Sequence, residues 1–255
     1  MAKVVSITNQ KGGVGKTTTS INLAACLVKR GQRILLIDMD PQGNATVGCG
    51  LHLEAGSVTT IYDLLLNETT TSEAIIKSDS GIDLITANGD LAGAQIELLN
   101  EIGRELRLKQ ALSSIQKDYD YIFIDCPPAL NVLTINALVA SDSVLIPMQC
   151  EYFALEGLSA LISTVRKIRE TLNPQLKIEG LLRTMFDGRN SLSNEVSSQL
   201  QTHFGDKVYK TVIPRNVRLA EAPSYGEPVI VYDPSSRGAK AYIALADEIL
   251  KLAKK

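Results

Sequence analysis

The chain has 255 residues, with 26 Lys and Arg against 28 Asp and Glu, which gives a formal net charge of −2. This balance excludes a strongly basic protein that coats nucleic acid through bulk charge, and a hydrophobic content of 45% excludes a disordered chain. The sequence has no apolar run of about 18 residues and no signal peptide, so we expect a cytoplasmic protein without stable membrane association.

Short runs rich in Val and Ile alternate with helical patterns, and these runs are apolar enough for strands buried on both faces. In chain order the predicted elements are strand Lys3–Thr8, helix Lys16–Arg30, strand Arg33–Asp38, strand Ile82–Ala87, helix Glu97–Gln116, strand Tyr121–Asp125, helix Leu130–Ala140, strand Ser143–Met148, helix Ala154–Leu172, strand Lys177–Met185, helix Ser193–His203, strand Lys207–Ile213 and helix Ser235–Ala253. This alternation predicts an α/β fold over residues 1–255, as a single domain with a doubly wound, mostly parallel sheet flanked by helices on both faces.

Charge is distributed unevenly along the chain. Residues 1–176 carry 14 basic and 19 acidic side chains, whereas residues 177–255 carry 12 and 9. A basic surface is therefore expected in the C-terminal third. The basic side chains placed there in predicted loops and at helix starts are Arg183, Arg189, Arg215, Arg218, Arg237 and Lys240.

A glycine-rich motif directly follows the first predicted strand and opens the first predicted helix. It reads Lys11-Gly12-Gly13-Val14-Gly15-Lys16-Thr17-Thr18, in the strand–loop–helix context that a phosphate-binding loop requires. The glycines let backbone N–H groups turn towards phosphates, and the helix start adds its unpaired donors and positive dipole. We expect Lys16 to contact the β- and γ-phosphates of ATP and the Thr17 hydroxyl to bind Mg²⁺.

Carboxylates end two of the predicted strands. Asp125 ends an apolar strand at the edge where open α/β sheets bind ligands, so it fits an acid that supports Mg²⁺ through a bound water. Asp38 ends another strand and is a second candidate for the metal site, and Asp40 follows it in a turn-rich loop. Either of these two acids could instead cap the turn.

These motifs together resemble those of the ParA/Soj partition ATPases, members of the deviant Walker A (MinD/ParA) superfamily of P-loop NTPases. K-G-G-V-G-K-T-T (11–18), D-M-D-P-Q-G-N (38–44) and Y-I-F-I-D-C-P-P (121–128) match its Walker A, switch I and Walker B segments. The match continues to I-P-R-N-V-R-L-A-E-A (213–222) and G-E-P-V (226–229), so it covers nearly the whole chain. No segment precedes Lys3 to carry the helix-turn-helix extension of longer plasmid-type members, so we expect the short, chromosomal-type form.

The resemblance implies a homodimer that forms when ATP is bound. Lys11 would reach across the interface to the partner's phosphates, and Gly12 would lie where the two phosphate loops approach each other. Lys11 has no acidic neighbour in its own loop, so a phosphate of the partner would satisfy its charge. The resemblance also implies that Asp40 orients the attacking water. An exposed carboxylate is a weak base at neutral pH, which predicts slow hydrolysis.

Further roles come from the same resemblance. Pro214 and Asn216 match the segment that lies against adenine, and Arg189 and Arg218 match surface arginines that bind DNA non-specifically. Such phosphate-directed binding is independent of sequence and sensitive to salt. The family also implies a ParB-type centromere-binding partner that stimulates hydrolysis, and a nucleoid-associated protein that serves chromosome or plasmid segregation.

Two alternatives remain open. The amphipathic segment Tyr242–Lys255 could lie on a membrane surface, as in the related MinD division-site ATPases, although docking onto the sheet is the simpler expectation. A redox ATPase similar to nitrogenase iron protein would need cysteines placed to ligate a cluster. The four cysteines have no metal-ligand spacing, which favours reduced core residues instead.

Overall fold

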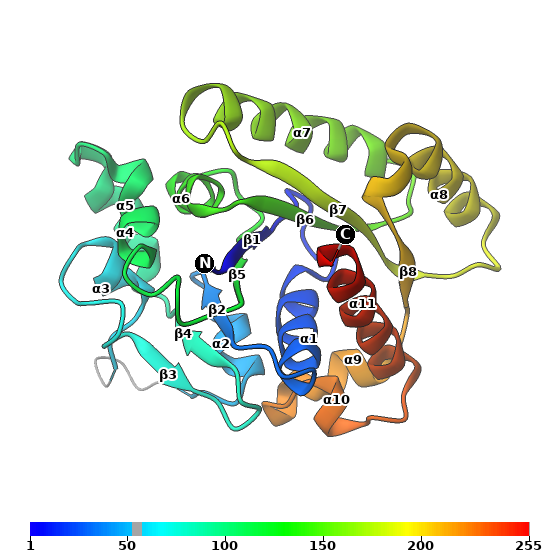
Figure 1. Cartoon of the computed structure of the whole chain (residues 1–255). Helices are drawn as coiled ribbons and strands as arrows, with labels where there is room; N and C mark the ends of the chain where they lie inside the picture. The colour runs from blue at the N-terminus through cyan, green and yellow to red at the C-terminus, as the bar shows by residue number, and fades with distance from the viewer. Residues whose placement is uncertain (53–57, 255) are drawn as a thin grey trace.

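The computed structural model describes residues 1–52 and 58–254. Its centre is an eight-stranded sheet with the strand order β3-β4-β2-β5-β1-β6-β7-β8 (Figure 1). Neighbouring strands are parallel except for β3 and β4, which pair antiparallel. The predicted α/β class with a doubly wound, mostly parallel sheet is confirmed.

The strands agree with the predicted ones to within a few residues, except for one that the sequence did not indicate. This is β3, a short antiparallel strand at the edge of the sheet. The strands are β1 (Lys3–Ile7), β2 (Ile34–Asp38), β3 (Ile75–Lys77), β4 (Asp83–Ile85), β5 (Tyr121–Asp125), β6 (Ser143–Gln149), β7 (Lys177–Phe186) and β8 (Val208–Pro214).

The helices include five of the six predicted ones and several short ones. They are α1 (Lys16–Lys29), α2 (Asn44–Gly48), α3 (Ile61–Leu65), α4 (Leu91–Glu97), α5 (Arg107–Leu112), α6 (Val132–Ala140), α7 (Ala154–Thr171), α8 (Ser191–Phe204), α9 (Val217–Glu221), α10 (Val229–Tyr232) and α11 (Arg237–Ala253), with 3₁₀ turns η1 (Leu98–Asn100), η2 (Arg104–Leu106), η3 (Gly205–Lys207) and η4 (Ala222–Tyr225). None of the described helices is both long and apolar enough to cross a membrane.

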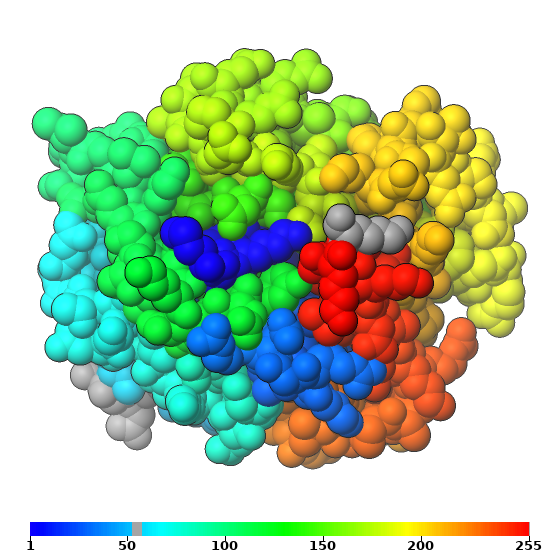
Figure 2. Space-filling model, in the orientation of Figure 1, coloured from blue at the N-terminus to red at the C-terminus, as the bar shows by residue number. Residues whose placement is uncertain are grey.

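Helices cover both faces of the sheet. α1 and α11 lie side by side on one face, and α6 and α7 lie on the other (Figure 1). Because side chains alternate along a strand, Leu36 of β2 joins the core beneath α1 and α11, whereas Leu35 joins the core beneath α3 to α6. Figure 2 shows that the N-terminal strand and the end of α11 reach the same side of the molecule.

The C-terminal helix α11 docks onto the sheet. The simpler of the two expectations for this segment is therefore confirmed. Its apolar side chains Tyr242, Leu245 and Ile249 are buried with exposures of 1%, 0% and 5%. The Tyr242 hydroxyl also lies 3.1 Å from the Thr19 hydroxyl of α1. The apolar face of α11, which a membrane-surface helix would need to expose, is therefore buried inside the protein.

The single helix predicted over Glu97–Gln116 is wrong. α4 ends at Glu97, two 3₁₀ turns follow, and α5 begins only at Arg107. Gly103 has a left-handed φ of 72°, and a right-handed helix cannot continue through a residue in that conformation. The apolar periodicity of the segment survives the break, because Leu98 and Leu108 are both fully buried.

The pairing of β7 with β8 is irregular near the carboxyl end of the sheet. Arg183 pairs with Val212 and Phe186 with Pro214, so three steps along β7 span two along β8. This one-residue surplus is a β-bulge at Thr184 and Met185.

Arg183, expected among the surface arginines, is buried with 5% exposure, so that expectation is wrong. Its guanidinium donates to the Ser197 hydroxyl of α8 at 2.8 Å and to the main-chain oxygen of Tyr209 at 2.8 Å. Glu248 of α11 accepts from the main-chain N–H groups of Lys210 and Thr211 at 2.7 and 2.9 Å. Side chains thus satisfy the backbone in the middle of β8.

Candidate nucleotide site

The phosphate loop lies between β1 and α1, at the carboxyl edge of the sheet. Gly15 adopts a left-handed φ of 85° as the residue that caps α1, a conformation that glycine supplies without a steric penalty. Lys16 follows with 7% exposure, and its Nζ donates to the main-chain oxygen of Lys11 at 3.2 Å. Burial lowers the pKa of Lys16, and the nearby carboxylate of Asp125 opposes that shift.

A polar cleft of about 430 Å³ opens above this loop. Its lining combines the phosphate loop, the segment after β2, one residue from the loop after β5 and one residue near the end of β7. The lining residues are Gly12, Gly13, Gly15, Lys16, Thr17, Thr18, Asp40, Gln42, Asn44, Pro128 and Met185. The predicted phosphate-binding residues and Asp40 therefore meet in one cleft.

Asp125 lies beneath the phosphate loop, fully buried. One carboxylate oxygen accepts from the Thr17 hydroxyl at 2.7 Å and the other from the Ser20 hydroxyl at 2.7 Å. Burial, reinforced by Asp38, raises the pKa of Asp125 to about 7. Thr17 and Asp125 thus come together as a metal site of this type requires.

Asp38 is the register neighbour of Asp125 across β2 and β5. Its carboxylate accepts from the N–H and the hydroxyl of Thr46, both at 2.8 Å, and from the N–H of Asp40 at 3.1 Å. Burial raises the pKa of Asp38 to about 6, and the bonds from Thr46 oppose this shift. Both oxygens of Asp38 therefore hold the segment that carries Asp40, and a metal-binding role for Asp38 stays a prediction.

Asp40 follows β2 and borders the cleft opposite the phosphate loop. Its carboxylate accepts from the N–H of Gln42 at 3.0 Å, and its main-chain oxygen accepts from the N–H of Gly43 at 2.9 Å. These bonds form a tight turn that fixes the direction of the side chain. A carboxylate held in this way beside a phosphate cleft suits the positioning of a water molecule.

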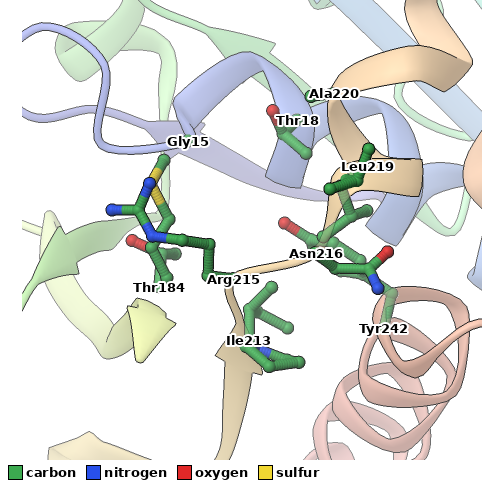
Figure 3. A pocket seen from close by; sticks show the side chains of 12 residues that line it. Gly15, Thr18, Thr184, Ile213, Arg215, Asn216, Leu219, Ala220 and Tyr242 are labelled. Atoms are coloured by element: carbon green, nitrogen blue, oxygen red, sulfur yellow. The ribbon is translucent and has the colours of Figure 1, made fainter. Parts of the chain in front are cut away.

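A second, more apolar cavity of about 400 Å³ adjoins the cleft and shares Gly15, Thr18 and Met185 with it. Thr184 and Arg215 lie on one side of this cavity and Asn216 and Leu219 on the other (Figure 3). Pro214 also lines it, as predicted for the adenine segment. The amide oxygen of Asn216 is buried without a hydrogen-bond partner among the described residues. A planar base with an amino group fits these walls.

Lys11 lies at the rim of the cleft, and the structure corrects one inference about it. The sequence indicated that its own loop has no acid and that a partner's phosphate would satisfy its charge, but the ammonium already pairs within its own chain with Glu151, which follows β6. An acid placed just after a predicted strand was the signal that could have found it, because such ends meet at this edge of the sheet. Beside Lys11, a Cβ added to Gly12 would meet no atom of its own chain within 4 Å.

The two predicted DNA-binding arginines lie outside the cleft. Arg189, after β7, is 91% exposed and forms two hydrogen bonds with Asp187, at 2.9 and 2.8 Å. These bonds lower the pKa of Asp187 to about 2. Arg218 of α9 is 51% exposed and pairs with Glu221 and Asp233 at 2.8 and 3.3 Å. Each arginine is thus neutralised within its own chain.

Oxygen donors dominate the place where a metal would bind. Among residues 1–52 and 58–254, no three His, Cys, Asp or Glu side chains gather closely enough to hold a metal by themselves. The four cysteines, Cys26, Cys49, Cys126 and Cys150, are buried and unpaired by disulfides within that part of the chain. The donor set therefore fits Mg²⁺ bound jointly by Thr17 and phosphate oxygens, and it does not fit an iron–sulfur cluster.

Comparisons with known proteins agree with this geometry. The family model described as an AAA domain matches residues 2–178. The sporulation initiation inhibitor protein Soj of Bacillus subtilis is 57% identical over 251 residues, covering 98% of each chain. The chromosome partitioning protein ParA of Caulobacter vibrioides is 51% identical over 251 residues, covering 97% of this chain and 94% of its own.

Among solved structures, the cobyrinic acid a,c-diamide synthase of Mycobacterium smegmatis with a bound ATP analogue and magnesium superposes with a TM-score of 0.87. It is 36% identical and is covered to 97%, with 100% of this chain aligned. The sequence identity to curated partition proteins, the parallel sheet and the phosphate cleft lead to one assignment. The chain belongs to the ParA/Soj family of chromosome-partitioning P-loop ATPases.

Proposed function

We propose that this protein is an ATP-dependent dimerisation switch that binds double-stranded DNA non-specifically as the ATP-bound homodimer and hydrolyses ATP slowly. The observation that carries this proposal is the unequal placement of two lysines. Lys16 is buried at the floor of the cleft, whereas the Lys11 side chain is 45% exposed at its rim. The inner lysine suits the chain's own nucleotide, and the outer one is available to the nucleotide of a second copy.

ATP would occupy both cavities at once. Its phosphates would lie against the backbone N–H groups of residues 12–18 and the ammonium of Lys16. Mg²⁺ would be held by the Thr17 hydroxyl and supported by Asp125, and it neutralises charge on the phosphates when bound. Pro214 and Asn216 would contact the base, with the amide oxygen of Asn216 accepting from its amino group.

Asp40 would orient the attacking water towards the γ-phosphate. A carboxylate that positions water without abstracting its proton gives little rate enhancement, so hydrolysis would be slow until a partner improves the geometry. A ParB-type centromere-binding protein fills that role in this proposal. The protein would then be cytoplasmic and nucleoid-associated, in the service of chromosome or plasmid segregation.

Dimerisation would exchange the Lys11–Glu151 pair for a contact between Lys11 and a phosphate of the partner. Because exposed ion pairs contribute about 0–1 kcal/mol, a triphosphate with several negative charges competes easily with one carboxylate. Arg189 and Arg218 of the two copies would together contact DNA phosphates. Loss of the γ-phosphate on hydrolysis would remove the bridging charge and release both the dimer and the DNA.

DNA binding and binding to anionic liposomes, each measured with ATP and with ADP, test this proposal. We expect DNA binding with ATP alone, persistence in Asp40→Ala because ATP stays intact, and a steep decrease with added salt. Liposome binding without DNA binding would favour a MinD-like protein instead. That alternative has little support here, because the apolar stripe of α11 is buried against α1 and the sheet.

Gly12→Val tests the dimer. Since a Cβ at Gly12 meets no atom of its own chain within 4 Å, the variant should fold and bind ATP yet remain monomeric in sedimentation experiments. Gly89→Val is the matched control, because Gly89 is equally open and lies outside the cleft. A normal ATP-bound dimer of Gly12→Val would contradict the proposed contact between phosphate loops.

A further inference from the structure

Met185 lies where the two halves of the nucleotide site meet. It is one of the residues that line both the phosphate cleft and the base cavity. A ligand that places a base in one cavity and phosphates in the other must therefore pass next to its side chain. Met185 also has a left-handed φ of 48°, a conformation that is unfavourable for a residue with a side chain and is retained mainly where it has a use.

The bulge in β7 explains this conformation. Its extra residue turns Thr184 towards the phosphate loop, where the Thr184 hydroxyl donates to the main-chain oxygen of Val14 at 2.7 Å. Met185 lines the same base cavity as Thr184, and Gln149 of β6 donates both to the sulfur of Met185 and, at 3.2 Å, to the main-chain oxygen of Gly13. The bulge thus ties the end of β7 to the phosphate loop at two points.

The chain that leaves the bulge leads directly to an arginine on the surface. Phe186 is anchored by the guanidinium of Arg183, 5.8 Å from the ring centre. Asp187 comes next and holds Arg189 through both carboxylate oxygens. Only Phe186 therefore separates Met185, in the wall of the nucleotide site, from the carboxylate that neutralises Arg189.

We propose that Met185 senses the bound nucleotide and couples it to the Asp187–Arg189 pair. A nucleotide that spans both cavities presses on Met185, shifts the bulge, and alters the hold of Asp187 on Arg189. This inference rests on the proposed function, because DNA binding is the property that Arg189 would report. It adds a route within one subunit by which nucleotide reaches the DNA-binding surface, in addition to the doubling of that surface in a dimer.

Met185→Gly tests the inference, because glycine adopts the left-handed conformation freely and removes the side chain. We expect ATP affinity, measured with a fluorescent analogue, to fall about tenfold through the lost apolar contact. At saturating ATP, we expect the ratio of DNA affinities with and without nucleotide to fall below the wild-type ratio but to stay above one, because dimerisation still doubles the DNA-binding surface. Met185→Leu retains an apolar side chain of similar size and should restore both properties.

Asn67→Gly is the matched control, since Asn67 is the other described non-glycine residue with a left-handed φ, at 62°, and is exposed. It should change neither measurement. Wild-type ATP affinity in Met185→Gly would overturn the nucleotide contact, and an unchanged DNA ratio at saturating ATP would overturn the coupling. If the wild-type protein shows no ATP-dependent DNA binding, the proposed function fails, while the ATP titration still decides whether Met185 contacts the nucleotide.

Discussion

The basic residues inside the nucleotide cleft and those on the outer surface are held in opposite ways. Lys16 is buried, donates to a main-chain oxygen, and makes no salt bridge within residues 1–52 and 58–254. Lys11, Arg189 and Arg218 are exposed, and each pairs with a carboxylate of its own chain. The inner cation is ready for a ligand, whereas the outer cations are neutralised until a partner competes.

Under the proposed function, this difference would let a chain with a net charge of −2 bind a polyanion reversibly. Exposed pairs such as these contribute about 0–1 kcal/mol each, so DNA phosphates can displace the carboxylates at little cost. If nucleotide binding increases the number of arginines that face DNA, or releases them from their carboxylates, the affinity for DNA would then change strongly.

The largest difference in effect is expected between substitutions of the two lysines. Lys16→Ala should weaken ATP binding by about 100-fold or more, because it removes a desolvated charge from the phosphates. Lys11→Ala should leave the ATP affinity of the monomer within about threefold of wild type, because an exposed charge contributes little. Isothermal titration below the dimerisation concentration measures both. An equal loss of ATP affinity in the two variants would show that Lys11 binds the nucleotide of its own chain. The cleft and the outer surface would then not differ as described.

Buried acids in the cleft should make the nucleotide-free protein sensitive to pH. The pKa values of Asp38 and Asp125, about 6 and about 7, lie above the value near 3.8 of an unfolded chain. The folded protein therefore binds more protons between about pH 4 and pH 7, and the free energy of unfolding falls as pH rises through this window. At about 1.4 kcal/mol per pH unit, these values correspond to at most about 3 kcal/mol for Asp38 and about 4 kcal/mol for Asp125.

Urea unfolding at pH 5 and pH 8, without nucleotide or Mg²⁺, measures this effect. Asp125→Asn should flatten the dependence, because an amide does not titrate. By contrast, Asp187→Asn should add no slope in this window, since the pKa of Asp187 is about 2. A wild-type slope that Asp125→Asn leaves unchanged would place the titrating groups elsewhere.

The smallest effect is expected on the outer surface. Asp187→Asn removes the carboxylate that holds Arg189 and should raise DNA affinity about twofold to threefold at low salt. Glu195→Gln, an exposed acid on α8, makes the same change in net charge and serves as the control. Fluorescence anisotropy measures the DNA affinity of both variants. If their DNA affinities rise equally, net charge alone explains the increase and the pairing of Arg189 is irrelevant.

Much of the phosphate site could be predicted from sequence, because its parts follow local rules. A glycine-rich loop between a strand and a helix, and acids at the ends of parallel strands, converge wherever the strands are neighbours. Register then places Asp38 beside Asp125 without further assumptions. The break of the predicted helix at Gly103 was also visible in principle, since glycine commonly ends helices.

Other parts of the site depend on tertiary contacts that have no sequence period. The bulge at Thr184 and Met185 arises where β7 has one more residue than β8 between the pairs Arg183–Val212 and Phe186–Pro214. Thr46 holds Asp38 from a five-residue helix that no apolar pattern marks. The pairing of Glu151 with Lys11 joins residues far apart in the chain. Such contacts appear only once the fold has brought the segments together.

The contact of Glu248 with β8 bears on solubility. β8 is the last strand of the sheet, and an unpaired edge strand is a template on which other chains can add and aggregate. Glu248 occupies the N–H groups of Lys210 and Thr211 in the middle of this edge, and it does so with a charge that an incoming strand would have to bury. The edge of the sheet at β8 is therefore protected against the addition of a strand from another copy of the chain.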